Sequence, residues 1–245
     1  MLIVRVRGVL PPSVYAGSPT AQNWNEMIER LRKQIPAEEF DYQTLLDGLK
    51  GYSRPRDKIT AMLRKKMLIR VKKGIYVFGE TYARGPFSRE VLANMIYGPS
   101  YVSLDYALHY YALIPERVEA VTSVACGRSR RFSTPMGLFV YRMIPMEAYQ
   151  IGMDQVELER GRSFLMATPE KALADKLWDD RGTGIRTQKE MRSYLLDHLR
   201  IDPEGLRKLD PDRLAAIALR YHSRKIETLA EVVRHLTRSS IAETP

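Results

Sequence analysis

Apolar residues recur at helical spacing in the first part of the chain. Trp24, Met27, Ile28, Leu31 and Ile35 fall on one face of a helix, charged residues lie between them, and Pro36 follows. This pattern predicts an amphipathic helix of about three turns that ends at the proline. A second, shorter helix is expected after Asp41, whose side chain suits an N-cap. A third is expected to begin at Pro55, because proline fits the first turn of a helix.

Two β-rich runs follow the third predicted helix. They cover residues 67–71 and 75–78 and enclose a tip that contains Gly74. Two such runs around a short, glycine-containing tip predict a β-hairpin. Three helices followed by a hairpin are the element order of a winged helix-turn-helix, which we expect at residues 21–82. Residues 1–20 are expected to form an N-terminal arm.

The rest of the chain alternates between helical and strand patterns. Apolar runs at residues 118–125, 138–144 and 164–167 predict strands, and a basic loop with a short strand lies between the first two. Ser88 and Ser103 are expected to cap the helices that follow them.

Thr168 and Pro169 open a strong helical pattern, because they supply the cap and the proline of a helix start. Three further amphipathic helices are expected near residues 187–199, 210–222 and 224–237. The sequence therefore predicts the α+β class, with a winged helix-turn-helix followed by a mixed α/β domain. We place that second domain at residues 86–245 and treat residues 186–245 as its helical extension.

The charged residues are unevenly distributed along the chain, and this indicates a class of partner. The 245 residues include 39 Lys and Arg against 29 Asp and Glu, a formal net charge of +10. Ten of the basic side chains and a single acid, Asp57, fall within residues 50–73. Such a concentration favours a polyanionic partner, either nucleic acid or an anionic membrane surface. The hydrophobic content of 44% suits folded cores and excludes a disordered tail protein.

The third predicted helix and the hairpin place this charge where a winged helix meets DNA. The helix would enter the major groove, and the hairpin would reach backbone phosphates. The candidates for base edges or the groove are Arg54, Arg56, Thr60 and Arg64. The candidates for phosphate contacts are Lys58, Lys65, Lys72 and Lys73, and Ser53 completes the DNA-binding set. The alternative is a protein-interaction module, a role that winged helices also have.

Four motifs occur in order in the second part of the chain. They are YVSLDYALHYYALIPE, VTSV, RSRRFSTPMGLFVYRMIP and FLMATPEKALADKLW. In this order they resemble the AbiEi family of antitoxins. With the winged helix before them, the resemblance covers roughly residues 41–180.

The resemblance implies two functions. Members of this family are partners of nucleotidyltransferase toxins in bacterial type IV toxin–antitoxin systems, which act in abortive infection and phage defence. The winged helix is expected to bind inverted repeats in double-stranded DNA upstream of its own operon and to act as a repressor, and the C-terminal domain to counteract the toxin. Direct contact between the two proteins stays open. The alternative is a stand-alone transcriptional regulator whose C-terminal domain senses a ligand or a protein.

Three arginines stand within four residues of the second part. Arg128, Arg130 and Arg131 follow a predicted strand and belong to the basic loop. They are candidates for contact with phosphates or with an acidic partner, because guanidinium groups bind both. A solvated loop without a binding role explains the same residues equally well.

We expect no enzymatic activity, no metal and no cofactor. The four histidines are scattered, without the spacing of metal ligands, and the single cysteine, Cys126, has no evident histidine partner. Asp105, Glu170, Lys171 and Asp175 could form the magnesium site of a nuclease if they came together. However, Glu170 and Lys171 fall in the first turn of a predicted helix, where the helix dipole accounts for the acid.

The compartment is predicted from the cysteine count and the apolar runs. A single cysteine suits a reducing compartment. The apolar stretch at the start of the chain is broken by Arg5 and Arg7, and no run approaches the roughly 20 apolar residues that span a bilayer. We therefore expect a cytoplasmic protein without a membrane partner.

Overall fold

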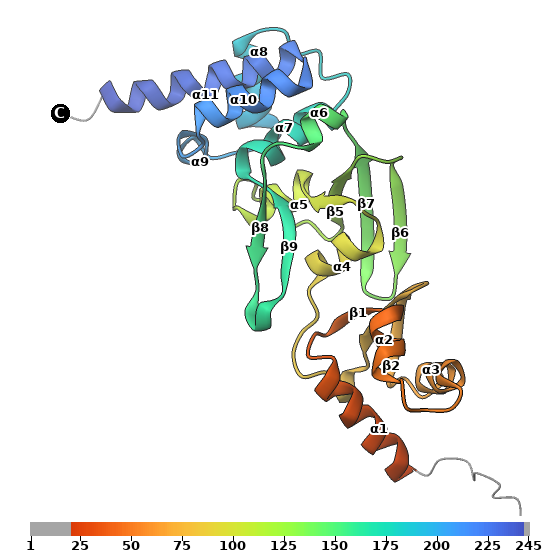
Figure 1. Ribbon diagram of the computed structural model, residues 1–245. Helices are drawn as coiled ribbons and strands as arrows, with labels where there is room; N and C mark the ends of the chain where they lie inside the picture. The colour runs from red at the N-terminus through yellow and green to blue at the C-terminus, as the bar shows by residue number, and fades with distance from the viewer. Residues whose placement is uncertain (1–20, 243–245) are drawn as a thin grey trace, which may run out of the picture.

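The computed structural model describes residues 21–242 (Figure 1). The predicted arm at residues 1–20 lies outside the described residues. Over these residues the chain has the predicted α+β class, with helices and two separate sheets, one of three strands and one of six. We name the parts built around these sheets the N-terminal unit (residues 21–82) and the second unit (residues 86–242).

The N-terminal unit contains three helices and a three-stranded antiparallel sheet of order β1-β3-β2. Its elements are α1 (Ala21–Gln34), β1 (Glu39–Asp41), α2 (Tyr42–Gly48), α3 (Pro55–Arg64), β2 (Leu68–Lys72) and β3 (Ile75–Phe78). The three helices and the hairpin are confirmed. The strand β1 was not predicted, because three residues are too few to show an alternating pattern.

A shared apolar core joins α1 to the small sheet. Ile28 and Leu31 of α1 are buried in the same cluster as Phe40 of β1 and Phe78 of β3. The two phenylalanine rings lie 4.7 Å apart between their centres. The Arg32 guanidinium lies 4.0 Å from the centre of the Phe78 ring, so its charge is buried against an aromatic face. The predicted amphipathic face of the first helix therefore packs as expected.

The second unit contains a six-stranded mixed sheet of order β6-β7-β5-β4-β9-β8. Its strands are β4 (Ser100–Val102), β5 (Val121–Ala125), β6 (Arg130–Thr134), β7 (Gly137–Met143), β8 (Met153–Glu157) and β9 (Ser163–Ala167). The pairs β5–β7 and β4–β9 are parallel, and the other neighbours are antiparallel. The sequence did not predict β4 and β8.

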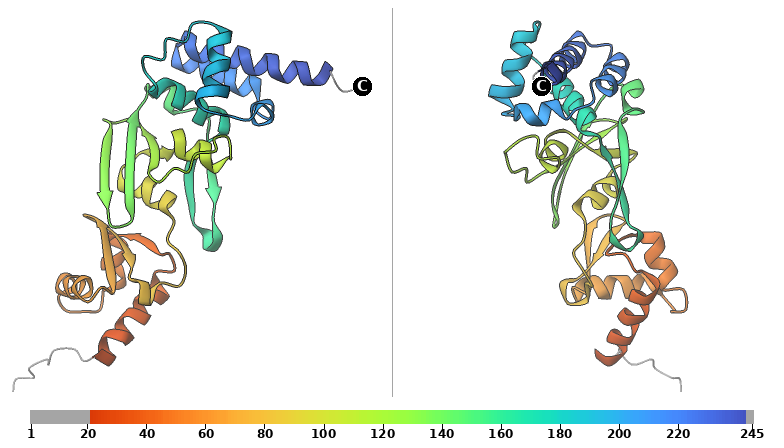
Figure 2. Two further views of the ribbon diagram at one scale, coloured as in Figure 1. Left: turned by 180° about the vertical axis from the view of Figure 1, so that it is seen from behind. Right: turned by 90° about the vertical axis from the view of Figure 1, so that its left-hand side faces the viewer.

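Helices pack on this sheet and at one end of it. They are α4 (Arg89–Ile96), α5 (Leu104–Tyr110), α6 (Met146–Tyr149), α7 (Pro169–Asp179), α8 (Gln188–Ser193), α9 (Pro203–Arg207), α10 (Pro211–Tyr221) and α11 (Arg224–Ala242). The helices from α8 onward gather at the end of the sheet that lies away from the N-terminal unit (Figure 1, Figure 2). Within residues 21–242, every helix is too short or too polar to cross a membrane.

The helical extension is part of the core. Leu195, Ile217, Leu229 and Val233 are fully buried and belong to the same apolar cluster as Tyr101 of β4. The predicted helices near 187–199, 210–222 and 224–237 correspond to α8 with a π-helical turn after it, α10 and α11. The short helices α6 and α9 were not predicted.

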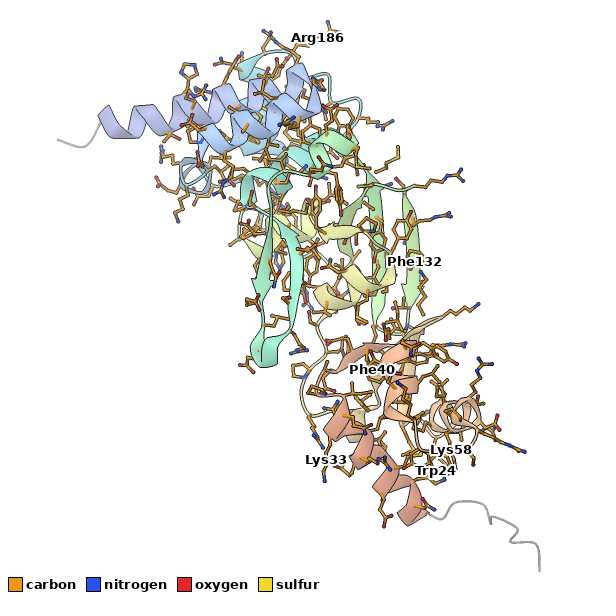
Figure 3. All side chains as sticks on the ribbon, in the orientation of Figure 1. Trp24, Lys33, Phe40, Lys58, Phe132 and Arg186 are labelled. Carbon is orange, nitrogen blue, oxygen red and sulfur yellow. The ribbon has the colours of Figure 1, made fainter. Side chains whose placement is uncertain are left out.

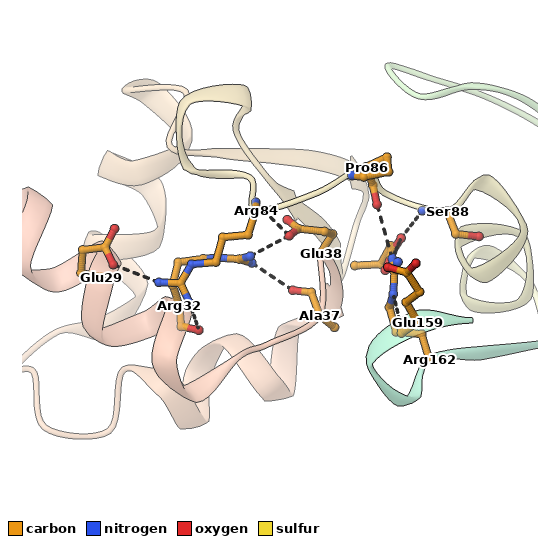
Figure 4. A network of polar contacts seen from close by, with 10 residues as sticks. Glu29, Arg32, Ala37, Glu38, Arg84, Pro86, Ser88, Glu159 and Arg162 are labelled. Atoms are coloured by element: carbon orange, nitrogen blue, oxygen red, sulfur yellow. Dashed lines mark hydrogen bonds and ion pairs between the residues drawn. The ribbon is translucent and has the colours of Figure 1, made fainter. Parts of the chain in front are cut away.

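Two carboxylates fix the junction between the units (Figure 4). Glu38 accepts a hydrogen bond of 2.6 Å from Arg32, inside the N-terminal unit. Its neighbour Glu39 lies 3.1 Å from Nη1 of Arg162, which belongs to the second unit. Glu39 also accepts a hydrogen bond from the backbone N–H of Ser88, at the start of α4. Glu39, the first residue of β1, thus connects the two units, and Glu38 directly before it is bound to α1.

Candidate nucleic-acid interface

The helix α3 separates an apolar face from a charged one. Ile59 and Met62 are buried at 4% and 0% exposure and pack into the N-terminal core. Pro55 occupies the first turn, as predicted, and Arg54 precedes it with a left-handed φ of 62°. The positive φ of Arg54 is uncommon for a residue with a side chain, so the turn before α3 is held in a specific shape.

The exposed face of α3 carries the predicted base-reading residues. Arg54, Arg56, Thr60 and Arg64 are all exposed. The Thr60 hydroxyl donates to the Arg56 carbonyl at 3.0 Å, the usual bond of a threonine within a helix. Within the described part of the chain, no hydrogen bond or ion pair engages the three guanidinium groups. Their donors are therefore available to a ligand.

Two of the predicted phosphate contacts lie over an indole ring. The ammonium group of Lys58 is 5.2 Å from the centre of the Trp24 ring (Figure 3). The ammonium group of Lys65 is 5.6 Å from the same ring centre. Trp24 is only 7% exposed, so α1 supplies a fixed aromatic support for both lysines. Ser53 is exposed beside the start of α3. The structure thus brings the basic residues of α3 to one end of the N-terminal unit.

The two lysines of the hairpin have different surroundings. Nζ of Lys72 donates to the carbonyl of Ile96 at 2.7 Å and lies 4.2 Å from the centre of the Phe132 ring. Both of those partners belong to the second unit, so Lys72 connects the units. Lys73 is exposed at the tip. The phosphate contact of Lys72 is still only a prediction, and this conformation does not favour it because the ammonium group already has partners. Lys73 is well placed for a phosphate contact.

The arginines of the second unit lie on and beside β6. Arg130 and Arg131 are the first two residues of this strand, and Arg128 is in the loop before it. All three are exposed. Phe132 packs inward against Tyr97 and Tyr141, with ring centres 6.1 Å and 5.7 Å away. The strand is therefore anchored by one aromatic side chain and presents its arginines to solvent.

The residues considered for a nuclease site have other partners. Asp105 forms an ion pair of 3.0 Å with Lys176. Glu170 accepts a hydrogen bond of 3.0 Å from the backbone N–H of Asp210, at the start of α10. Among residues 21–242, no group of three or more His, Cys, Asp and Glu residues is arranged to hold a metal ion. Burial raises the pKa of the Cys126 thiol, which disfavours the reactive thiolate.

Lys171 and Asp175 form a fully buried ion pair. Nζ of Lys171 lies 2.6 Å from the Asp175 carboxylate, and both side chains are 0% exposed. Burial lowers the pKa of Lys171, and the Asp175 charge opposes that shift. Asp175 also accepts hydrogen bonds from Ser103 at 2.6 Å, from Tyr101 at 3.1 Å and from Tyr221. The pair thus links β4 and α7 to α10.

The structure corrects one cap prediction. Ser103 does precede α5, but its side chain makes no capping bond to that helix. Its hydroxyl instead donates to Asp175, a buried carboxylate that needs donors. The Thr122 hydroxyl takes over at the buried start of α5, where it accepts from the backbone N–H of Tyr106 at 3.0 Å. The predicted caps at Ser88 and Thr168 are confirmed, since their side chains accept from Val91 and Lys171.

Comparison of the sequence with models of protein families gives no match, and comparison with curated proteins gives no significant one.

Proposed function

We propose that this protein is a DNA-binding transcriptional regulator and that its N-terminal unit is a winged helix. The element order α1-β1-α2-α3-β2-β3 and the sheet order β1-β3-β2 support this reading. The observation that carries the proposal is the exposed face of α3. Arg56 and Arg64 are exposed along the helix and Arg54 directly before it, while Ile59 and Met62 are buried, and the three guanidinium groups have donors that match guanine edges and phosphates.

In the proposed complex, α3 enters the major groove. Arg56 and Thr60 face base edges near the start of the helix, where a recognition helix reads sequence. Lys58, Lys65 and Lys73 contact phosphates, which supply affinity and register but no sequence information. Lys72 is omitted from this set, because its ammonium group binds the second unit.

A gel-shift titration tests this proposal. The purified protein is titrated against DNA from upstream of its own gene and against a scrambled duplex of equal length, at two salt concentrations. We expect tighter binding to the upstream DNA and a steep loss of affinity with salt, because several phosphates are neutralised. Equal, weak binding to both duplexes would contradict sequence-specific regulation.

We further propose that the protein is an antitoxin that represses its own operon. The support is the resemblance of the four ordered motifs to AbiEi antitoxins, which implies a nucleotidyltransferase toxin as functional partner. The test is growth of cells that express a nucleotidyltransferase encoded beside this gene, with and without this protein. Rescue by the full chain and by a variant that cannot bind DNA is expected. Failure of both to rescue would favour a stand-alone regulator.

A further inference from the structure

The six-stranded sheet of the second unit has two open edges. β6 pairs only with β7 and β8 only with β9, so within the described part of the chain the outer side of each strand is unpaired. The two edges lie on opposite sides of the second unit in both the front and the back view (Figure 1, Figure 2). Open edges expose rows of backbone donors and acceptors that can pair with another strand.

The charges on the two edges are opposite. Arg130 and Arg131 on β6 are exposed, and so are Asp154 and Glu157 on β8. Residues an odd number of positions apart on a strand point to opposite faces of the sheet. Each edge therefore carries its charge on both faces, positive on β6 and negative on β8. In the described part of the chain, no ion pair engages any of these four side chains.

We propose that β6 of one copy of this chain pairs with β8 of a second copy. Charged edge strands usually prevent association of sheets, because equal edges repel each other. In this protein two β6 edges would repel each other, and so would two β8 edges. A β6 edge and a β8 edge attract each other, with one pair of opposite charges available on each face of the sheet.

This pairing joins unlike surfaces. An interface between two different patches of the same protein leaves one free edge at each end of the assembly, so further copies can add. The association needs no DNA, and its failure would leave the proposed regulator function untouched. The exposed arginines of β6 could also bind nucleic acid, and the experiment separates the two cases.

Sedimentation velocity of nuclease-treated, DNA-free full-length protein tests the proposal. At low salt the sedimentation coefficient of the wild type is expected to rise with concentration, and at high salt to fall to the monomer value, because screening weakens exposed charge pairs. R130E/R131E makes both edges acidic, and D154R/E157R makes both basic. Each variant alone is expected to lose self-association by about tenfold or more.

Mixing the two variants is the decisive step. In an equimolar mixture of R130E/R131E and D154R/E157R, every β6–β8 contact between the two different variants joins unlike charges, so association is expected to return. The matched control is R192E/R220E, which makes the same charge change at exposed sites on α8 and α10 and is expected to associate like the wild type. The single changes R131E and E157R repeat the comparison if a double variant does not fold by circular dichroism.

Three outcomes overturn the proposal. The first is a wild type that stays monomeric at low salt, and the second is a mixture that does not re-associate. The third is association that disappears on nuclease treatment, which would assign Arg130 and Arg131 to nucleic acid instead.

Discussion

The ammonium group of Lys72 lies 4.2 Å from the centre of the Phe132 ring, and these residues belong to different units. Lys72 ends β2 of the N-terminal unit, and Phe132 is the central residue of β6 in the second unit. The same ring packs against Tyr97 and Tyr141 in the core. The proposed DNA-binding hairpin is thus attached directly to the sheet of the second unit.

Lys72 and Lys73 are adjacent, but substitution of Lys72 is expected to affect stability, and substitution of Lys73 is expected to affect DNA binding. K72A removes a cation–π contact and a hydrogen bond and should lower the free energy of unfolding by about 1 kcal/mol. K73A should leave stability unchanged and reduce the salt slope of DNA binding by about one. Urea unfolding and gel shifts at several salt concentrations measure both. A larger change in the salt slope with K72A than with K73A would contradict the assignment.

Arg56 is expected to determine sequence preference. R56A should weaken binding to the upstream DNA by about 1–3 kcal/mol and to a scrambled duplex much less, because a base contact is lost. K73A is the matched control, since it should weaken binding to both duplexes alike. An equal loss on both duplexes with R56A would place that arginine on a phosphate.

The buried pair of Lys171 and Asp175 is expected to depend on both partners. D175N leaves a buried ammonium group without its counter-charge and should lower the free energy of unfolding by about 3–5 kcal/mol. The double variant K171M/D175N removes both charges, keeps an oxygen acceptor for the hydroxyls around residue 175, and should lose less than D175N alone. Urea unfolding of the single and double variants tests this. If the double variant loses as much unfolding free energy as D175N or more, the loss in D175N does not come from an uncompensated Lys171 charge.

Stability is expected to fall at alkaline pH. Burial is the main cause that raises the pKa of Tyr111 and of Tyr149 to about 12, from the usual 10.0. Above pH 10 the unfolded chain therefore loses protons that the folded chain keeps, so the free energy of unfolding decreases as pH rises. Lys171 acts in the opposite direction, because its folded pKa is lowered and the unfolded chain binds the proton more tightly.

Urea midpoints measured between pH 8 and 11 test this balance. The midpoint is expected to fall above about pH 10, and Y111F and Y149F should each make the fall shallower. A midpoint that rises over this interval would mean that Lys171 outweighs the tyrosines.

The helices of the N-terminal unit could be predicted from local signals. Pro55 fixes the start of α3, and the spacing of Ile59 and Met62 fixes its buried face. The strand β8 could not be predicted, because only Met153 and Val156 of its five residues are apolar and the edge position does not require more. The hydrogen bond from Ser103 to Asp175 could not be predicted either, because the two residues are 72 positions apart in the sequence.

The candidate DNA-binding residues were predicted as a set, but their partners were not. Exposure of Arg64 follows from helix periodicity, which places it opposite Ile59 and Met62, whereas Arg54 precedes the helix and is exposed in the turn. The contact of Lys72 with Ile96 and the ring of Phe132 depends on how the units meet, which no spacing within the hairpin reveals. A charged residue in a predicted hairpin tip therefore indicates a DNA contact less reliably than a charged residue on a predicted helix face.

The order of synthesis has different consequences for the two cores. The buried cluster of the N-terminal unit is formed by residues 24–78, so it can close while the ribosome is still adding later residues. The cluster of the second unit includes Tyr101 but also Leu229 and Val233. It can close only after almost all of the described chain has left the ribosome. During translation the arginines of α3 can therefore be in place for some time before the second unit is complete.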